Sequence, residues 1–326
     1  MANESPSPIH NQFLATPEQL APYEAAFAPF AEAAYRAAGQ IDDFRSRAGL
    51  DPYGLGDVSY DTTFGEQRCL LKEGGSIWSD GSSRWVEGLS EIKGAGSDKW
   101  VTIIDGPDGQ KYAVKGMRLD PTDSYASRKK LDGTEGEASP EERLRRKLLH
   151  STAPLIAGES LEGLEQLVAV DLERNLMVTT TISPSQLVVD MSGREIAAQM
   201  RRRHVEQLAR TRVGMRERGL HYHNAGGILF NRDAGFLFVD PTFEEAEKLD
   251  PIRGLMLASR NPADSTESLI QFIVEDHRKI EAMQHDRAMG SGTPYEFMRT
   301  TGLRAVWQGV LMRWAREIDA RTQTGQ

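Results

Sequence analysis

Two β-forming runs on either side of a short turn place the strongest constraint on the fold. The runs WVTII and KYAVKGM are separated by DGPDGQ, in which Asp-Gly pairs and a proline supply turn chemistry. This order predicts a β-hairpin that ends near Met117. Two further pairs of strands are predicted, one in EQLVAVDL and NLMVTTTI and one in GILFNRDAGFLFVD.

Helix signals lie between and after these strands. Ser139, Pro140 and the two glutamates that follow have the pattern of an N-cap, a first-turn proline and an acidic first turn. A later helix is predicted because Ile196, Met200, His204 and Leu208 recur at every fourth position. Its arginines are expected to lie on the outer face of the helix, exposed to solvent. They are Arg201, Arg202, Arg203, Arg210 and Arg212.

The elements divide the chain into four parts. Residues 1–16 are polar and proline-rich and are expected to be a flexible arm, and residues 17–81 a helical and loop extension. Residues 82–183 hold most predicted strands, whereas residues 184–326 are mostly helical after a linker near Ile182 to Met191. Separate strand-rich and helix-rich parts predict the α+β class.

Composition excludes several classes of protein. The 326 residues carry a formal charge of −9, which argues against a surface that coats nucleic acid. The single cysteine, Cys69, cannot form an internal disulfide. Because the sequence shows neither a membrane-spanning run nor a cleavable signal, we expect a cytoplasmic protein, although export by an uncleaved signal would leave no trace.

A glycine turn and a strand lysine suggest a phosphate-binding site. Gly94 and Gly96 lie in GAGSDKWV, where glycines let backbone N–H groups approach phosphate oxygens. Lys115 follows on the second strand of the hairpin, within reach of the same phosphates. Their order and spacing fit one ligand, although each feature alone also occurs in ordinary turns and strands.

With these residues, the sequence resembles the protein-kinase-like superfamily, which includes bacterial small-molecule phosphotransferases. Gly94, Gly96 and Val101 match its G-x-G-x-x-G-x-V motif, with Lys99 in place of the third glycine, and Ala113 and Lys115 match V-A-I-K. The resemblance implies a two-lobed fold, with a small antiparallel sheet lobe and a helical lobe, against which the N-terminal helical extension would pack. It also implies ATP and Mg²⁺ as cofactors, bound in the cleft between the lobes.

The resemblance assigns further residues to the nucleotide. Lys115 would contact the α- and β-phosphates, and Glu141 or Glu142, with Glu142 preferred, would be its ion-pair partner. The apolar walls around adenine would be Val101, Ala113 and Leu229. Asp240, at the end of a hydrophobic strand, would bind Mg²⁺ as a hard oxygen ligand.

The catalytic loop departs from the family pattern H-x-D-x-x-x-x-N. The sequence GLHYHNAGGIL has the first histidine at His221, but His223 stands at the aspartate position. Counting onward places Ile228 at the metal-binding asparagine, and Asn224 is the nearby amide that remains as a candidate metal ligand.

Several activities stay open on this sequence. The main expectation is phosphoryl transfer to a protein or small-molecule hydroxyl, with Lys115, His223 and Asp240 as catalytic residues and His223 as the base. The alternatives are a nucleotide-binding pseudokinase that acts through protein contacts, and nucleotidyl transfer (AMPylation). A different reading takes His221 and His223 as transition-metal ligands, with His204, Glu244 or Asp240 as the third.

Overall fold

The computed structural model describes part of the chain, which forms two compact units. The described residues are 13–47, 60–64, 67–72, 76–79, 92–95, 99–117, 138–181, 199–221, 228–243, 265–271, 273 and 301–324. The first unit comprises residues 1–156 and 166–183, and the second comprises residues 157–165 and 184–326. Helices and small antiparallel sheets both contribute, which confirms the predicted α+β class.

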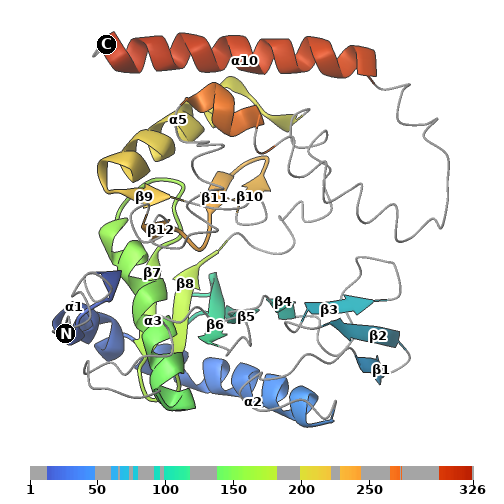
Figure 1. Cartoon of the computed structure of the whole chain (residues 1–326), viewed down its shortest axis with the longest axis vertical. Helices are drawn as coiled ribbons and strands as arrows, with labels where there is room; N and C mark the ends of the chain where they lie inside the picture. Colours follow the sequence, from blue (N-terminus) through green and yellow to red (C-terminus); the bar gives the residue numbers. More distant parts are fainter. Residues whose placement is uncertain are drawn as a thin grey trace, which may run out of the picture. The chain divides into compact units, whose positions relative to one another are not determined.

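A five-stranded antiparallel sheet forms the centre of the first unit (Figure 1). Its strands have the order β4-β5-β6-β8-β7. They are β4 (Ile92–Ala95), β5 (Lys99–Asp105), β6 (Lys111–Met117), β7 (Leu167–Asp171) and β8 (Leu176–Thr180). The predicted hairpins β5–β6 and β7–β8 are confirmed, and the pairing of β6 with β8 joins them.

Local side-chain bonds close both hairpins. In the β5–β6 turn, the Asp108 carboxylate accepts a hydrogen bond from the Gln110 N–H at 3.0 Å. In the β7–β8 turn, Asp171 accepts from the N–H groups of Glu173 and Arg174 at 2.9 and 3.1 Å. Aspartate bonds of this kind stabilise turns without distant contacts, which explains why sequence pattern located both turns.

Three N-terminal helices lie against this sheet, and the second and third of them cover one of its faces. They are α1 (Pro17–Ala25), the 3₁₀ helix η2 (Ala28–Phe30) and α2 (Ala31–Arg47). Phe27 and Phe30, with Ala34, pack in a core with Trp100 and Val114 on the sheet. The Trp100 ring lies so close to Gly116, its cross-strand partner, that a Cβ there would approach the indole to 2.2 Å.

The opposite face packs against α3 (Pro140–Ala157) and part of α1. Leu148 and Leu155 of α3 share a core with Met177 of β8 and Leu20 of α1. The predicted start of α3 is confirmed, because the Ser139 hydroxyl accepts from the Glu142 N–H at 3.2 Å while the Glu142 carboxylate accepts from the Ser139 N–H at 2.8 Å.

The N-terminal extension contains strands as well as helices. A three-stranded antiparallel sheet of order β1-β2-β3 lies within residues 17–81, where the sequence predicted only helices and loops. Its strands are β1 (Tyr60–Phe64), β2 (Gln67–Lys72) and β3 (Ser76–Ser79). Cys69 lies on the central strand β2, paired with Thr62 and Ser79.

Helix α5 (Arg202–Glu217) and short antiparallel pairs form much of the second unit (Figure 1). The strands are β9 (Leu220–His221), β10 (Ile228–Asn231), β11 (Gly235–Phe238) and β12 (Thr242–Phe243), and the last helix is α10 (Thr301–Thr324). β10 and β11 form the third predicted hairpin, which is confirmed. No helix in the described part of the chain is long and apolar enough to cross a membrane.

The helix predicted to run through Met200 and His204 is interrupted just before α5, although Gln199 is helical. Met200 and Arg201 are not helical, and Arg201 is extended, with φ −118° and ψ 166°. The Arg201 N–H donates to Nδ1 of His204 at 3.0 Å, so the helix begins at Arg202 with a side-chain cap. The sequence pattern does not reveal this break, because Met200 is buried in the core and so continues the apolar repeat of the helix.

Buried polar side chains of α5 bind neighbouring segments. The Gln207 amide accepts from the Phe236 N–H at 2.8 Å and donates to the Phe236 carbonyl at 3.2 Å, which fixes β11 against the helix. The Thr211 hydroxyl donates to the Glu162 carbonyl at 2.7 Å. Because buried polar groups are costly when unpaired, these bonds specify which segments pack on α5.

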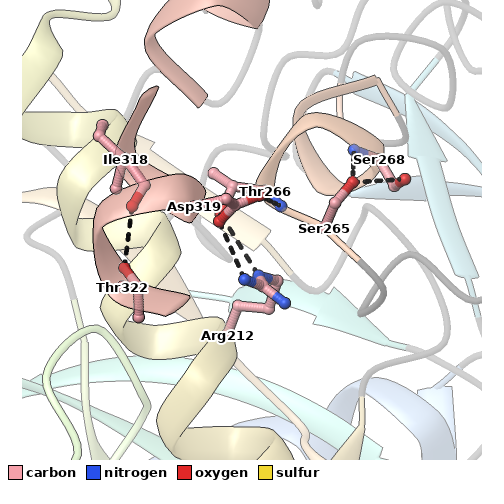
Figure 2. A network of polar contacts seen from close by, with 7 residues as sticks. All are labelled: Arg212, Ser265, Thr266, Ser268, Ile318, Asp319 and Thr322. Atoms are coloured by element: carbon pink, nitrogen blue, oxygen red, sulfur yellow. Dashed lines mark hydrogen bonds and ion pairs between the residues drawn. The ribbon is translucent and has the colours of Figure 1, made fainter. Parts of the chain in front are cut away.

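Arg212 corrects the prediction that all five arginines of this helix are solvated. Its side chain is 8% exposed and donates to Asp319 of α10 at 2.9 Å (Figure 2). Asp319 also accepts from the Thr266 hydroxyl at 2.6 Å and from the Thr266 N–H at 2.8 Å. Thr266 begins a helical segment that Ser265 caps, so one carboxylate joins three helical segments.

Replacing Arg212 by methionine is expected to destabilise the second unit by about 3 kcal/mol or more, because Asp319 stays largely buried without its counter-ion. The matched control is Arg210→Met on the same helix. Arg210 and its partner Glu162 are 58% and 57% exposed, so this change should cost at most about 1 kcal/mol. Urea denaturation followed by circular dichroism compares the two, and equal losses would contradict the expected role of Arg212.

Candidate functional site

One face of the five-stranded sheet carries the residues that the sequence predicts for nucleotide binding. Gly94 on β4 pairs with Val101 on β5, which pairs in turn with Lys115 on β6. Directly opposed residues in antiparallel strands have side chains on one face, and so do residues two apart on a strand. Ala113 therefore shares this face with Lys115 and Val101. The structure thus brings four of the predicted residues together.

Lys115 is buried in this face, with only 2% of its surface exposed. Its cross-strand neighbours are Val101 on one side and Met177 on the other, and Ala113 is 3% exposed. A buried ammonium is costly unless it is compensated, and Lys115 has an interaction partner in the structure. A lysine held among apolar side chains attracts an anion more strongly than one in water.

The other predicted nucleotide contacts of the first unit are less direct. The carboxylate of Glu142 caps α3 through the Ser139 N–H, and Arg146 one turn later is 8% exposed. Burial lowers the pKa of Arg146, whereas the Glu142 charge raises it. An ion pair of Glu142 with Lys115 remains a prediction. Gly96 lies outside the described residues.

In the second unit, two strand pairs bring together the segments that carry the remaining predicted residues. β9 pairs with β12, and β10 pairs with β11. Segment 222–227 connects β9 to β10, and segment 239–241 connects β11 to β12. Both connections therefore run between the β9–β12 pair and the β10–β11 pair. The strand pairing thus keeps the ends of one connection close to the ends of the other.

Of the segment predicted to be a catalytic loop, the structure describes the beginning and the end. His221 ends β9, is 3% exposed and pairs with Thr242. His223 and Asn224 lie in segment 222–227, outside the described residues, so their roles as base and metal ligand remain predictions.

Asp240 has an unusual backbone conformation. Its φ is 55°, in the left-handed region that residues other than glycine rarely adopt, and it directly precedes Pro241. The Asp240 N–H donates to the carboxylate of Glu165 at 3.0 Å, and Glu165 is 1% exposed. The buried carboxylate of Glu165 thus holds the backbone N–H of Asp240, whose own carboxylate is predicted to bind the metal.

Neighbouring positions on β10 lie in different surroundings. Ile228 is 3% exposed and belongs to the hydrophobic core of the second unit together with Phe230 and Phe238. The position that motif counting assigns to a metal-binding asparagine is therefore an apolar core position. Leu229 is half-buried and, by the alternation of a strand, faces away from that core, opposite Leu237.

Both ring nitrogens of His204 bond to backbone groups, so this side chain has a structural role. Its Nδ1 accepts from the Arg201 N–H, and its Nε2 lies 3.0 Å from the carbonyl oxygen of Arg232. A ring whose Nδ1 is an acceptor carries its proton on Nε2, so the imidazole is neutral and both nitrogens are occupied. His204 therefore does not supply the third ligand of a histidine metal site. Among the described residues, no three His, Cys, Asp or Glu side chains form a group that could hold a metal ion.

The residue types in each unit can be tested separately against the expected cofactors. In the first unit, a buried lysine beside Val101 and Ala113 is compatible with phosphates next to an apolar base. In the second unit, Asp240 has the hard oxygen atoms that Mg²⁺ prefers, and Mg²⁺ usually needs only one or two carboxylates.

Sequence reasoning missed Glu165. The residue stands between Leu164 and the apolar run of β7, where an acid looks like an ordinary start of a strand. Its partner lies 75 residues away, so local pattern carries no signal for the bond.

Comparisons with known proteins give a distant likeness to solved structures. No protein-family model matches the chain, and no curated protein matches it. Among solved structures, it is similar to ROP2 from Toxoplasma gondii, described as a virulence factor with a protein-kinase fold and no enzymatic activity. The identity is 14% and the TM-score 0.33, over 87% of this chain and 85% of that chain. A likeness of this size carries no argument about activity.

The neutral state of His204 predicts a pH dependence of stability. Burial, followed by the charge of Arg203, lowers its pKa, while the Arg232 carbonyl and Asp233 act in the opposite direction. The unfolded chain therefore binds a proton at a higher pH than the folded one. The stabilising contribution is complete above about pH 6.5, the ordinary pKa of histidine, and is lost as the pH falls toward the lower folded pKa.

The test compares wild type with His204→Gln, whose amide keeps a donor and an acceptor but does not titrate. Thermal unfolding of both proteins is measured from pH 8 to pH 5. Wild type should lose stability more steeply than the variant below about pH 6.5. Parallel curves would show that His204 is not the titrating group.

Proposed function

We propose that the chain is a nucleotide-binding protein of the protein-kinase-like class that binds ATP with Mg²⁺ and acts through protein contacts. The observation that carries nucleotide binding is the single sheet face that joins Val101, Ala113 and buried Lys115. In this proposal, Lys115 binds the phosphates, and the apolar residues lie against adenine. Asp240, in the second unit, is the metal ligand.

The proposal favours binding without turnover because the residues expected for catalysis are replaced. His223 stands where the class has its aspartate base, and the position counted as the second metal ligand is Ile228 in the hydrophobic core. A core isoleucine cannot ligate a metal, so Asn224 would have to serve from another position. Binding requires fewer of these groups than transfer does, and a partner protein would then respond to the nucleotide-bound form.

Transfer is the second candidate, favoured because the first unit holds a buried lysine and the second holds an aspartate whose backbone N–H is bonded to Glu165. Mg²⁺ would neutralise charge on the phosphates when bound. The residues of the chain would then align the phosphates through Lys115, and His223 would accept the proton of an acceptor hydroxyl. Phosphoryl transfer depends mainly on positioning and charge, so the loss of an aspartate base need not abolish it.

Nucleotide binding should raise the melting temperature of the protein. ATP at about 100 times its dissociation constant adds about 2.7 kcal/mol of stability. Lys115→Met, which keeps the length of the side chain but removes its charge, should abolish most of the shift, and Asp240→Asn should abolish its Mg²⁺ dependence.

The matched control is Lys111→Met on the same strand. Lys111 forms an ion pair with Asp105 and is 41% exposed, so its loss should leave the shift unchanged. Thermal shift assays over a range of Mg²⁺ concentrations compare the variants. No shift in wild type with saturating ATP would refute the nucleotide site.

Labelled ATP separates the two candidate functions. With binding alone, neither α- nor γ-label should move to the protein itself or to general protein acceptors under conditions where the thermal shift is complete. Movement of γ-label would establish a phosphotransferase, and movement of α-label would establish a nucleotidyl transferase. In either case His223→Ala should lower the rate of transfer more than nucleotide affinity.

A further inference from the structure

The turn that carries Asp240 is built on a segment from a distant part of the sequence. The Phe238 N–H donates to the Gly163 carbonyl at 2.7 Å, and the Glu165 N–H donates to the Phe238 carbonyl at 2.9 Å. Leu164 and Phe238 form a parallel bridge between these bonds. Segment 163–165 therefore accompanies β11 to its last residue, two positions before Asp240.

Helix α5 fixes this segment from the other side. Gly163 has a φ of 77° and approaches Thr211 so closely that a Cβ would lie 2.6 Å from its hydroxyl oxygen. The Thr211 hydroxyl also donates to the Glu162 carbonyl at 2.7 Å. The backbone that presents Glu165 is thus held by a helix and by a strand, and Glu165 has little freedom to move.

Asp240 needs such a fixed partner because its conformation is locally unfavourable. A positive φ brings Cβ close to the following carbonyl in any residue other than glycine. Proline at the next position further disfavours helical backbone at the residue before it and pushes it toward extended conformations. A buried carboxylate is a strong acceptor, and its bond to the Asp240 N–H opposes both tendencies.

We infer that Glu165 is a positioning residue for Asp240. Through the Asp240 N–H it keeps this residue left-handed, and the direction of the Asp240 carboxylate follows from that backbone conformation. Glu165 itself does not contact the ligand. The consequence for Mg²⁺ rests on the proposed function, whereas the effect on the backbone does not.

The decisive experiment measures backbone conformation through stability, without nucleotide. Asp240→Gly and Asp240→Ala both remove the carboxylate, but only alanine is strained at a positive φ. Each is made with Glu165 present and with Glu165→Leu, and urea denaturation gives the four unfolding equilibria. With Glu165 present, the glycine variant should be the more stable of the two. With leucine at position 165, alanine should be the more stable of the two. Without its hydrogen bond to Glu165, residue 240 can leave the left-handed region, and folding then costs glycine more backbone entropy than alanine.

The preference should change by about tenfold in the unfolding equilibrium constant between the two backgrounds. The matched control is Glu162→Leu, which removes the neighbouring carboxylate but not the bond to Asp240, and it should leave the preference for glycine intact. An unchanged preference in the Glu165→Leu background would overturn the inference. If that variant does not fold, Glu165→Gln decides, because a neutral acceptor holds the N–H less strongly and the preference should shrink.

A second measurement connects this result to the metal. The Mg²⁺ concentration that gives half of the ATP-induced thermal shift should rise about tenfold in Glu165→Leu and by no more than about twofold in Glu165→Gln, while the metal-free shift stays unchanged. An unchanged Mg²⁺ requirement in Glu165→Leu would overturn the consequence for the metal. A wild-type protein with no ATP shift would refute the proposed function alone, and the four-variant comparison would still decide the role of Glu165.

Discussion

The second unit depends on the requirement that every polar group buried with helix α5 has a partner. His204 bonds to the carbonyl at the β10–β11 turn, Gln207 to the backbone of β11, and Thr211 to the segment before β7. Arg212 reaches Asp319 on the last helix. Each of these side chains would destabilise the unit if its partner were absent, so together they select one arrangement of segments. An apolar face on the same helix would pack with less selectivity.

This constraint extends to the candidate site. β11 lies against Gln207 on one edge and against segment 163–165 through Phe238, and Asp240 follows β11 after a single residue. The first unit uses a different principle. There, apolar side chains cover both faces of a sheet, and Lys115 is a buried charge at a face that Val101, Ala113 and Met177 also line. A charge at such a place is costly to bury, which is why it is the strongest functional signal in that unit.

The sequence predicted the elements that local chemistry determines. Turns closed by Asp108 and Asp171, and the cap formed by Ser139 and Glu142, involve residues at most three positions apart, and they belong to two of the three predicted hairpins and to α3. It was wrong about Arg212, whose partner is 107 residues away, and it could not detect Glu165. In both cases the residues around the charged side chain look the same whether that side chain faces water or a partner far away in the sequence.

The motifs did identify Lys115, Val101 and Ala113 as a group, because cross-strand neighbours in a hairpin follow directly from its register. The nucleotide roles of these residues, and those of His223 and Asn224, remain predictions.

The division of the chain has a consequence for taking the protein apart. Residues 157–165 belong to the second unit, although residues of the first unit precede and follow them. A fragment that starts at residue 184 therefore lacks the strip that accompanies β11 and the carboxylate that holds Asp240. A fragment that stops at residue 183 carries the same strip without the helix on which it packs. Neither unit is one continuous stretch of polypeptide, so no single cut in the gene yields either of them intact.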